Sequence, residues 1–347
     1  MRVLVTGHSG YIGTVLVPVL RAAGHDVVGL DTGFYAGCGL PRQLEPIPEL
    51  QKDIRDVEPA DLAGVDAVAH LAALCNDPLG NLDADLTLEI NYRATVRLAH
   101  LARAAGVRRF LFASSCSMYG TGSEDGFLTE DASLRPLTPY AESKVRAEED
   151  LSRLADHDFS PVFLRNATAY GVSPRLRADV VLNNLVGWAH TTGKVRILSD
   201  GMSWRPIVHV EDIAHAFLAC LESPREAIHN RAFNVGVNAE NYRVRELAQI
   251  VQKVVPGATV EYAGQNNPDP RSYRVDFTRI QQELPAFKPT WTARAGAEQL
   301  YRAMQVHALN SETFHGPRFV RLAQIRQLMA DGAVDGRLRW TKASVAA

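Results

Sequence analysis

The 347-residue sequence predicts an α/β fold: a doubly wound parallel sheet with a smaller, discontinuous C-terminal lobe. Two observations carry this prediction. Strand and helix patterns alternate through the first half of the chain, which favours right-handed crossovers and a parallel sheet covered by helices on both faces. Beyond residue 168 prolines break the pattern into shorter elements, so we expect a lobe assembled from separate pieces.

The first half supplies these elements in order. We expect strands at residues 2–6, 27–30, 67–70, 109–114 and 161–165, and a further short strand that ends at Asp53. Helical patterns start at Tyr11 and cover residues 85–105 and 139–155.

In the second half we expect a helix at 179–190, then a strand at 206–209 and a helix at 211–222 that return to the main sheet. The predicted domains are therefore 1–166 with 206–236, a lobe of 167–205 with 237–320, and a helical tail at 321–347. The segment from Pro317 to Trp340 carries an apolar stripe that must pack on this subunit or on another, formed by Phe319, Leu322, Ile325 and Leu328.

Composition excludes several classes of protein. The net charge is -2 and lysines and arginines are scattered, so we expect no nucleic-acid partner. The four cysteines are far apart and form no Cys-x-x-Cys pair, which argues against a metal site or a disulfide framework and fits a reducing cytoplasm. The first strand begins at Arg2, leaving no room for a signal peptide, and no apolar run approaches the ~20 residues of a membrane span.

A glycine-rich turn follows the first strand, in Thr6-Gly-His-Ser-Gly-Tyr-Ile-Gly13. Gly7 permits a tight turn, Gly10 lets the backbone approach a pyrophosphate, and Gly13 lets the helix pack close to the strand. The second strand ends in Asp31, at the distance where a carboxylate accepts hydrogen bonds from the adenosine ribose. No Arg or Lys adjoins Asp31 to receive a 2′-phosphate, so the sequence predicts NAD rather than NADP.

Tyr140 and Lys144 lie four residues apart in a predicted helix and so share one face. An ammonium group beside a phenol favours the phenolate, and the positive ring of a cofactor would act in the same direction. Tyr140 is therefore a candidate acid/base group at neutral pH. Taken alone, the spacing is also typical of a solvated helix face; the glycine turn and the strand end at residues 112–120 favour the catalytic interpretation.

Together these motifs resemble the extended short-chain dehydrogenase/reductase family, in its nucleotide-sugar epimerase and dehydratase branch. The resemblance covers residues 1–305 and implies a Rossmann-type fold. It rests on the motifs Thr6–Gly13, Asp31, Asp53-Ile54, His70-Leu-Ala-Ala73, Asn91, Ser114-Ser115, Tyr119-Gly120, Tyr140 with Lys144, Leu164-Arg165, Arg205 and Arg271.

The resemblance implies roles for these residues. Ser115 would bind the sugar hydroxyl that is oxidised, Tyr140 would be the general base, and Lys144 would bind the nicotinamide ribose and lower the pKa of Tyr140. The other implied NAD contacts are Gly7, Ser9, Gly10, Tyr11, Ile12, Gly13, Asp31, Asp53, Ile54, Leu71, Ala72 and Ala73. The implied substrate contacts are Cys116, Ser117, Asn184 or its neighbour Asn183, and the pair Arg205 and Arg271, which would clamp a nucleotide diphosphate unless each is a surface ion pair.

Two departures from the family bear on the reaction. Its 4,6-dehydratases place Asp-Glu after the catalytic Ser or Thr, and its UDP-glucuronate decarboxylases place Glu at the second position, whereas this chain has Cys116 and Ser117. Water elimination therefore lacks its expected acid and base. Cys116 is either a poised thiol or, as is usual for a free cysteine, an apolar filler. Thr168 stands where the family's Asn after Leu-Arg would fall, with Asn166 two residues earlier.

The sequence thus predicts an NAD-dependent nucleotide-sugar epimerase that inverts C4 through a 4-keto intermediate. The alternatives are a 4-ketoreductase of a deoxysugar nucleotide, a decarboxylase or dehydratase, and a non-catalytic NAD-binding protein. We also expect a homodimer formed by the helices at 85–105 and 139–155, because both have more apolar residues than one buried stripe needs. Those residues are Val96, Leu98, Leu101, Val145, Leu151 and Leu154.

Overall fold

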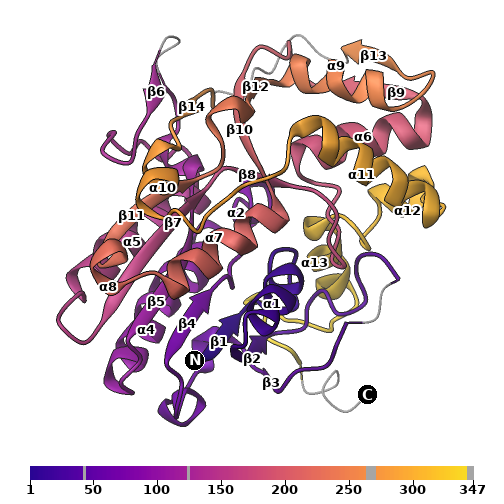
Figure 1. The fold of residues 1–347 in the computed structure, drawn as a ribbon. Helices are drawn as coiled ribbons and strands as arrows, with labels where there is room; N and C mark the ends of the chain where they lie inside the picture. Colours follow the sequence, from indigo (N-terminus) through magenta and orange to yellow (C-terminus); the bar gives the residue numbers. More distant parts are fainter. Residues whose placement is uncertain (42–43, 123–125, 263–270, 342–347) are drawn as a thin grey trace.

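The computed structural model describes residues 1–41, 44–122, 126–262 and 271–341. At its centre is a seven-stranded sheet whose strands all run parallel, in the order β11-β7-β5-β4-β1-β2-β3 (Figure 1). The strands are β1 (Arg2–Thr6), β2 (Asp26–Asp31), β3 (Glu49–Gln51), β4 (Ala67–His70), β5 (Arg109–Ser115), β7 (Ser160–Asn166) and β11 (Arg231–Val235). The predicted doubly wound parallel sheet is confirmed.

The order of the strands reverses between β1 and β4. From β1 the chain adds β2 and β3 on one side, then crosses back and adds β4, β5, β7 and β11 on the other. Because the strands are parallel, the loops that follow Thr6 and His70 leave the same edge of the sheet at this reversal. Doubly wound folds bind ligands in the crevice at such a position.

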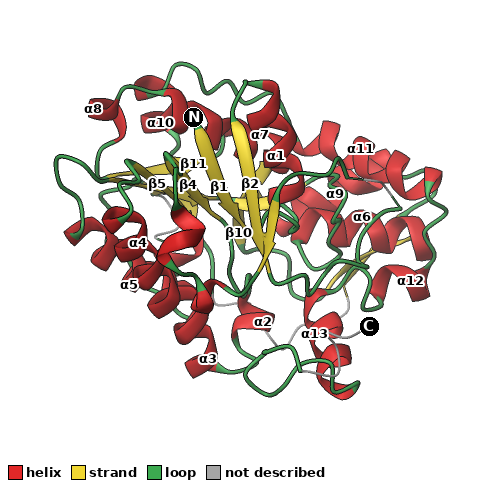
Figure 2. Cartoon of the chain, turned by 90° about the horizontal axis from the view of Figure 1, so that it is seen from below, coloured by secondary structure: helices red, strands yellow, loops and turns green. Residues whose placement is uncertain are grey.

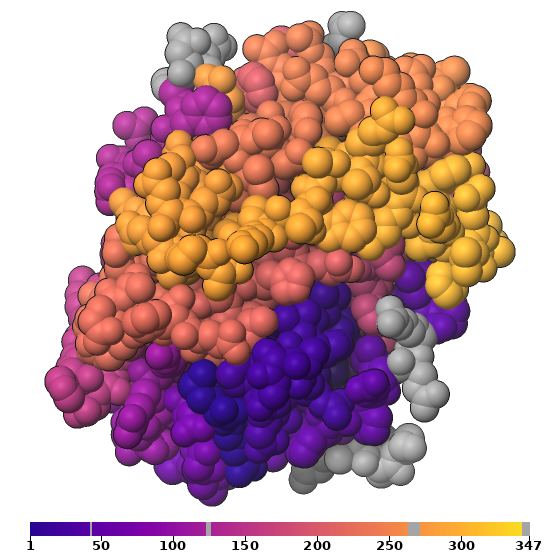
Figure 3. Space-filling view, viewed as in Figure 1, coloured from indigo at the N-terminus to yellow at the C-terminus, as the bar shows by residue number. Residues whose placement is uncertain are grey.

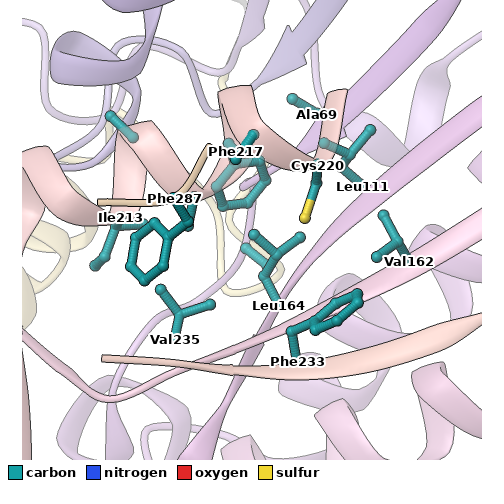
Figure 4. Packing of buried hydrophobic residues seen from close by; sticks show 14 of the residues in the cluster. Ala69, Leu111, Val162, Leu164, Ile213, Phe217, Cys220, Phe233, Val235 and Phe287 are labelled. Atoms are coloured by element: carbon teal, nitrogen blue, oxygen red, sulfur yellow. The ribbon is translucent and has the colours of Figure 1, made fainter. Parts of the chain in front are cut away.

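Helices cover both faces of the sheet. Figure 2 shows α1 and α7 on one side of the strands and α4 and α5 on the other. On the first side, Phe217 and Cys220 of α7 pack against Leu164 of β7 and Phe233 of β11 (Figure 4). The helices of the sheet domain are α1 (Gly13–Ala22), α2 (Asp77–Gly80), α3 (Ala84–Leu88), α4 (Ala94–Ala104), α5 (Pro139–Arg153), α7 (Val210–Glu222), α8 (Arg225–Ile228) and α10 (Thr278–Glu283).

The helix expected at 85–105 is divided into three pieces. α3 and α4 are joined by a π-helical turn at Glu89–Arg93. Asn91 in this turn is buried, and its side chain accepts a hydrogen bond from the Leu74 amide (2.8 Å) and donates one to the Leu74 carbonyl (3.0 Å). The wider turn directs Asn91 at the loop after β4, so this residue ties that loop in place.

One strand was assigned wrongly from the sequence. The strand expected at 206–209 is β10 (Trp204–His209), which pairs with β8 (Thr168–Tyr170) and β12 (Asn241–Arg243) in a separate three-stranded sheet. The cause lies in β7, whose continuation past Ala167 leaves the main sheet as β8 and takes β10 as its new neighbour. The strand that does return to the main sheet is β11, and the helix expected at 211–222 packs on that sheet as α7.

The lobe has its own hydrophobic core. Its main elements are α6 (Val181–Thr192), α9 (Val244–Val254), α11 (Ala293–Val306), α12 (Ser311–His315) and the parallel pair β9 (Lys194–Ile197) and β13 (Thr259–Tyr262), while β6 (Phe127–Leu128) pairs with β14 (Arg274–Val275). The orange and yellow atoms of the second half of the chain occupy the upper part of the face in Figure 3. In the described ranges, every helix is too short or too polar to traverse a lipid bilayer.

The C-terminal tail packs on its own chain. Its helix, α13 (Arg321–Ala330), buries Ile325 in the same hydrophobic cluster as Leu4 of β1, and Val334 and Leu338 join that cluster after the helix. The Trp340 indole N–H donates to the Thr32 carbonyl (2.7 Å). Of the predicted stripe, Leu322 and Leu328 lie against this cluster, whereas Phe319 precedes the helix and belongs to the core of the lobe.

Most of the apolar residues that were predicted to form a dimer interface lie in or against the hydrophobic core. Leu98, Leu151 and Leu154 are buried in the core beneath α4 and α5, and Leu101 packs against it. Only Val96 and Val145 of the six are left partly exposed without a place in that core. A homodimer stays a prediction that this structure neither supports nor opposes.

Candidate active site

A cavity of about 490 Å³ lies at the strand reversal. It brings together most of the residues singled out in the sequence: Gly7, Gly10, Tyr11, Ile12, Gly13, Asp31, Asp53, Ile54, Leu71, Ala72, Ala73, Ser115, Ser117, Tyr140, Lys144, Arg205 and Arg271. Ser9, Cys116, Asn183 and Asn184 are not part of its lining. The same cavity therefore contains the glycine turn, Asp31 and the two arginines.

The glycine turn has the shape that a pyrophosphate needs. Gly7 has a φ of 73°, and a Cβ there would lie 2.8 Å from the Ala72 nitrogen. A Cβ on Gly13 would lie 2.3 Å from the Gly7 carbonyl oxygen, so the third glycine is needed for packing of α1 on the turn itself. Gly10 faces the cavity, and its backbone leaves room for a ligand at the N-terminus of α1.

The acidic residues beside the turn are held by backbone groups. The Asp31 carboxylate accepts hydrogen bonds from the Ser9 amide (3.2 Å) and the Gly33 amide (2.8 Å). The Ser9 hydroxyl contacts His8 (3.1 Å) and Ser9 is not among the lining residues, so its contact with the cofactor stays a prediction. Asp53 caps the turn at Ile54–Asp56 and forms an ion pair with Arg55 (2.7 Å), which is why β3 ends at Gln51 rather than at Asp53.

Ser115, Tyr140 and Lys144 meet in the middle of the cavity. Ser115 ends β5, and its hydroxyl donates to the Ser117 hydroxyl (2.9 Å) and shares a hydrogen bond with Tyr140. Tyr140 and Lys144 lie on α5, which begins at Pro139 after its N-cap Thr138. The Lys144 ammonium donates to the Ala113 carbonyl (2.7 Å) and lies 5.7 Å from the centre of the Tyr140 ring.

Burial dominates the ionisation of this pair. It raises the pKa of Tyr140 to about 12, although the hydrogen bond with Ser115 opposes the rise. Burial also lowers the pKa of Lys144 to about 8. From the sequence, Lys144 is expected to lower the pKa of Tyr140. The protein's own groups raise this pKa instead, because the phenol is desolvated and the Lys144 ammonium donates to a backbone carbonyl.

Cys116 does not face the cavity. It is 1% exposed, and its thiol donates to the Arg165 carbonyl (3.1 Å). Burial raises the pKa of this thiol, so it stays protonated. Both the expected substrate contact and the poised thiol are therefore wrong, and Cys116 is the apolar filler that a free cysteine usually is.

The asparagines of α6 are also turned away. Asn184 donates to the Ala178 carbonyl (3.0 Å), and Asn183 accepts from the Gly171 amide (3.0 Å). The cavity instead meets the start of this helix at Val180 and Val181. Asn166 and Thr168 both line the cavity, and the Asn166 amide oxygen is buried without a hydrogen-bond partner among the described residues.

The two arginines expected at a diphosphate lie together. Arg205 donates to the carbonyls of Trp204 (2.7 Å) and Arg271, and the Arg271 guanidinium pairs with the Asp77 carboxylate. No sequence pattern indicates the Asp77 partner, which comes from the loop after β4. If Arg271 binds a diphosphate, its guanidinium must either leave the Asp77 carboxylate or contact both groups at once.

Sequence reasoning missed a second group of charged residues in the cavity. Arg177 and Asp179 form an ion pair (2.7 Å), and Arg321 reaches the cavity from the tail. Arg177 and Asp179 follow Gly171 in a Pro-Arg-Leu-Arg-Ala-Asp segment, whose charges match none of the predicted motifs. No local pattern could have placed Arg321 beside them.

Comparison with known proteins identifies the family. The sequence model of the NAD dependent epimerase/dehydratase family matches residues 3–236. The chain belongs to this family. Its residues fit the cofactor, because the glycine turn leaves room at the N-terminus of α1 and the Asp31 carboxylate lines the same cavity.

Several relatives share most of the chain. A UDP-glucose 4-epimerase of Mycolicibacterium smegmatis is 33% identical over 82% of this chain and 92% of its own length. A dTDP-glucose 4,6-dehydratase of Streptomyces griseus is 32% identical over 82% of this chain and 88% of its own. The solved structure of MoeE5 in complex with UDP-glucuronic acid and NAD superposes with a TM-score of 0.75 at 29% identity, over 89% of this chain and 100% of that one. The family is NAD-dependent, and the names of these relatives cover more than one reaction of sugar nucleotides.

Proposed function

We propose that the protein is an NAD-dependent nucleotide-sugar epimerase that inverts C4 of the sugar. The observation that carries the proposal is the meeting of Ser115, Tyr140 and Lys144 in one cavity, with Ser117 where dehydratases and decarboxylases of the family have a carboxylate. The 33% identity with a UDP-glucose 4-epimerase supports the same reaction.

Ser115 and Tyr140 have separate tasks. Ser115 positions the C4 hydroxyl by a hydrogen bond, and the Tyr140 phenolate removes its proton. NAD, when bound, would supply the hydride acceptor for C4 and the donor for its return. The 4-keto sugar would turn between the two transfers so that the hydride returns to its other face, and Tyr140 would give the proton back to the oxygen. No oxidant or reductant is consumed, because the electron pair returns to the same carbon.

Formation of the phenolate requires positive charge close to Tyr140. The protein's own groups leave the pKa of Tyr140 at about 12, owing to burial. The positive nicotinamide ring and a Lys144 ammonium released from the Ala113 carbonyl would each favour the phenolate. Proton removal is thereby linked to occupancy of the cavity.

Elimination of water has no suitable acid and base here. The carboxylates that line the cavity within the described residues are Asp31, Asp53, Asp77 and Asp179. Asp31 and Asp53 are predicted to bind the adenosine of NAD. Asp77 is paired with Arg271 and Asp179 with Arg177, so neither is poised to remove a proton from C5.

The test is turnover of purified protein with UDP-glucose, UDP-glucuronic acid and dTDP-glucose, with products identified by NMR. We expect one of these sugars to reach equilibrium with its C4 epimer without added cofactor, and Tyr140→Phe to abolish the conversion. A 4-keto-6-deoxy product, a decarboxylated sugar, or turnover that needs added NADH or NADPH would replace epimerisation with dehydration, decarboxylation or ketone reduction. Bound NAD with no turnover of any sugar would indicate a non-catalytic protein.

A further inference from the structure

Arg321 reaches into the active-site cavity from the C-terminal tail. It is the first residue of α13, its side chain is 1% exposed, and it lines the cavity. Its guanidinium lies 4.3 Å above the centre of the Tyr35 ring, and Nη2 donates to the Arg175 carbonyl (2.7 Å). Its Nη1 is buried and has no hydrogen-bond partner in the part of the chain that the structure describes.

A second buried arginine lies beside it. Arg177 pairs with both oxygens of Asp179 (2.7 and 3.1 Å), and its Nη1 donates to the Cys75 sulfur (3.0 Å). Asn76 donates a further hydrogen bond to Asp179 (2.9 Å). The cluster of Arg177, Asp179 and Arg321 thus contains one carboxylate, which already accepts three hydrogen bonds. Its two guanidinium groups leave an excess of positive charge.

Such an arrangement is unfavourable in the protein alone. A buried charge without a hydrogen-bonded counter-ion is costly, and like charges in a low-dielectric interior repel. Burial and the neighbouring charge of Arg177 both lower the pKa of the Arg321 guanidinium. The cluster therefore lacks an anionic acceptor that could face Nη1 from inside the cavity.

The position of the cluster narrows the choice of acceptor. Arg175, whose carbonyl accepts from Arg321, itself donates through Nε to the Ser9 carbonyl of the glycine turn (3.2 Å). Arg177 donates to Cys75 in the loop after β4, and Cys75 lines the cavity together with Tyr140. The two arginines are thus tied to the glycine turn on one side and to the loop after β4 on the other.

We propose that Arg321, supported by Arg177, forms a subsite for an anionic oxygen, of a phosphate or a carboxylate, on a ligand held in the cavity. The proposal rests on the proposed binding of NAD and a nucleotide sugar there. The oxygen has two sources: the diphosphate of NAD, or a carboxylate on the sugar. A guanidinium fork suits either one, because both offer two acceptor oxygens in a plane. The tail is then a component of the binding site.

The test compares Arg321→Met with Arg326→Met. Arg326 is exposed on the same helix and does not line the cavity, so its replacement controls for loss of one charge from α13. Titration calorimetry measures NAD binding to each variant after removal of bound nucleotide, and then binding of UDP-glucose and UDP-glucuronic acid at saturating NAD. Thermal melting without ligand reports stability.

We expect Arg321→Met to weaken one ligand at least tenfold while its melting midpoint without ligand is unchanged or higher, and Arg326→Met to match wild type. Weaker NAD binding identifies the diphosphate as the source. Unchanged NAD binding with a selective loss of UDP-glucuronic acid relative to UDP-glucose identifies the carboxylate.

The proposal is overturned if Arg321→Met leaves all three affinities within twofold of wild type, or if the variant melts several degrees lower with unchanged affinities, since Arg321 would then be a structural residue only. Wild-type protein that binds NAD but none of the sugar nucleotides would contradict the proposed function instead, and the NAD measurements would still decide the role of Arg321. Arg321→Lys, which keeps a charge but not the fork, should recover part of the lost affinity.

Discussion

Replacement of Lys144 by Met should stabilise the protein while abolishing its activity. Lys144 is 3% exposed, and burial lowers its pKa from 10.5 to about 8. The difference between these two pKa values corresponds to about 3 kcal/mol by which the fold disfavours the ammonium. The full amount applies at pH 7, where Lys144 is protonated in both the folded and the unfolded state. The lost hydrogen bond to the Ala113 carbonyl offsets about 1 kcal/mol of the gain.

The pH dependence provides the sharper measurement. Between the folded pKa of about 8 and the unfolded value of 10.5, the unfolded chain binds more protons, so the stability of wild type rises with pH through this window. The deficit of wild type relative to Lys144→Met should shrink from about 3 kcal/mol at pH 7 to about 1 kcal/mol at pH 10, before the hydrogen-bond correction. Taking the difference between the two proteins removes the titration of all other groups.

Melting curves of nucleotide-free protein at pH 7, 8, 9 and 10 give the readout. For 347 residues the unfolding entropy is about 0.7 kcal/mol/K, so the net gain of about 2 kcal/mol at pH 7 is a rise of about 3 °C. Turnover should fall at least about 100-fold. A variant that melts below wild type at pH 7, or a difference that does not change with pH, would refute the view that Lys144 is a strained, desolvated cation.

Four further predictions concern the site and the assembly. Tyr140→Phe should retain NAD binding and lose about 100-fold or more in kcat, because it removes the proton carrier but keeps the ring; more than a tenth of wild-type activity would exclude Tyr140 as the base. Wild type should bind NAD more tightly than NADP, since Asp31 would repel a 2′-phosphate; calorimetry showing the reverse order would overturn that role. Arg271→Ala should raise the KM for a nucleotide sugar at least about tenfold with little change in NAD affinity, and the nucleoside diphosphate should inhibit competitively; an unchanged KM without such inhibition would remove Arg271 from the diphosphate site. Mass measurement in solution should give a homodimer, and a monomer at micromolar concentration would contradict the proposed pairing of α4 and α5.

The features that could be read from the sequence are those with a local cause. The glycine turn is set by a positive φ at Gly7 and by the close contact at Gly13, and both need glycine whatever surrounds them. The parallel direction of the strands follows from the alternation of strands and helices. Tyr140 and Lys144 share a face because they lie on one helix. The cavity that joins these pieces follows from the parallel sheet itself.

The errors arose where a long-range contact decides the direction of a side chain. Cys116 and Ser117 lie in the 3-10 turn after β5, where Ser117 lines the cavity and the Cys116 thiol is buried against the Arg165 carbonyl of β7, a contact that no local pattern indicates. The pairing of Asp77 with Arg271 joins residues far apart in the chain. Arg321 could not have been placed at all, because no periodicity links the tail to the glycine turn.

The placement of the tail also governs when the molecule can finish folding. Ile325, Val334 and Leu338 lie in the same hydrophobic cluster as Leu4 of the first strand. During synthesis, every strand of the sheet emerges before these three residues. The apolar surface that they cover therefore stays exposed to water until the tail has been made. The central domain thus closes only when its last segment arrives, so the first and last parts of the protein fold as a single unit.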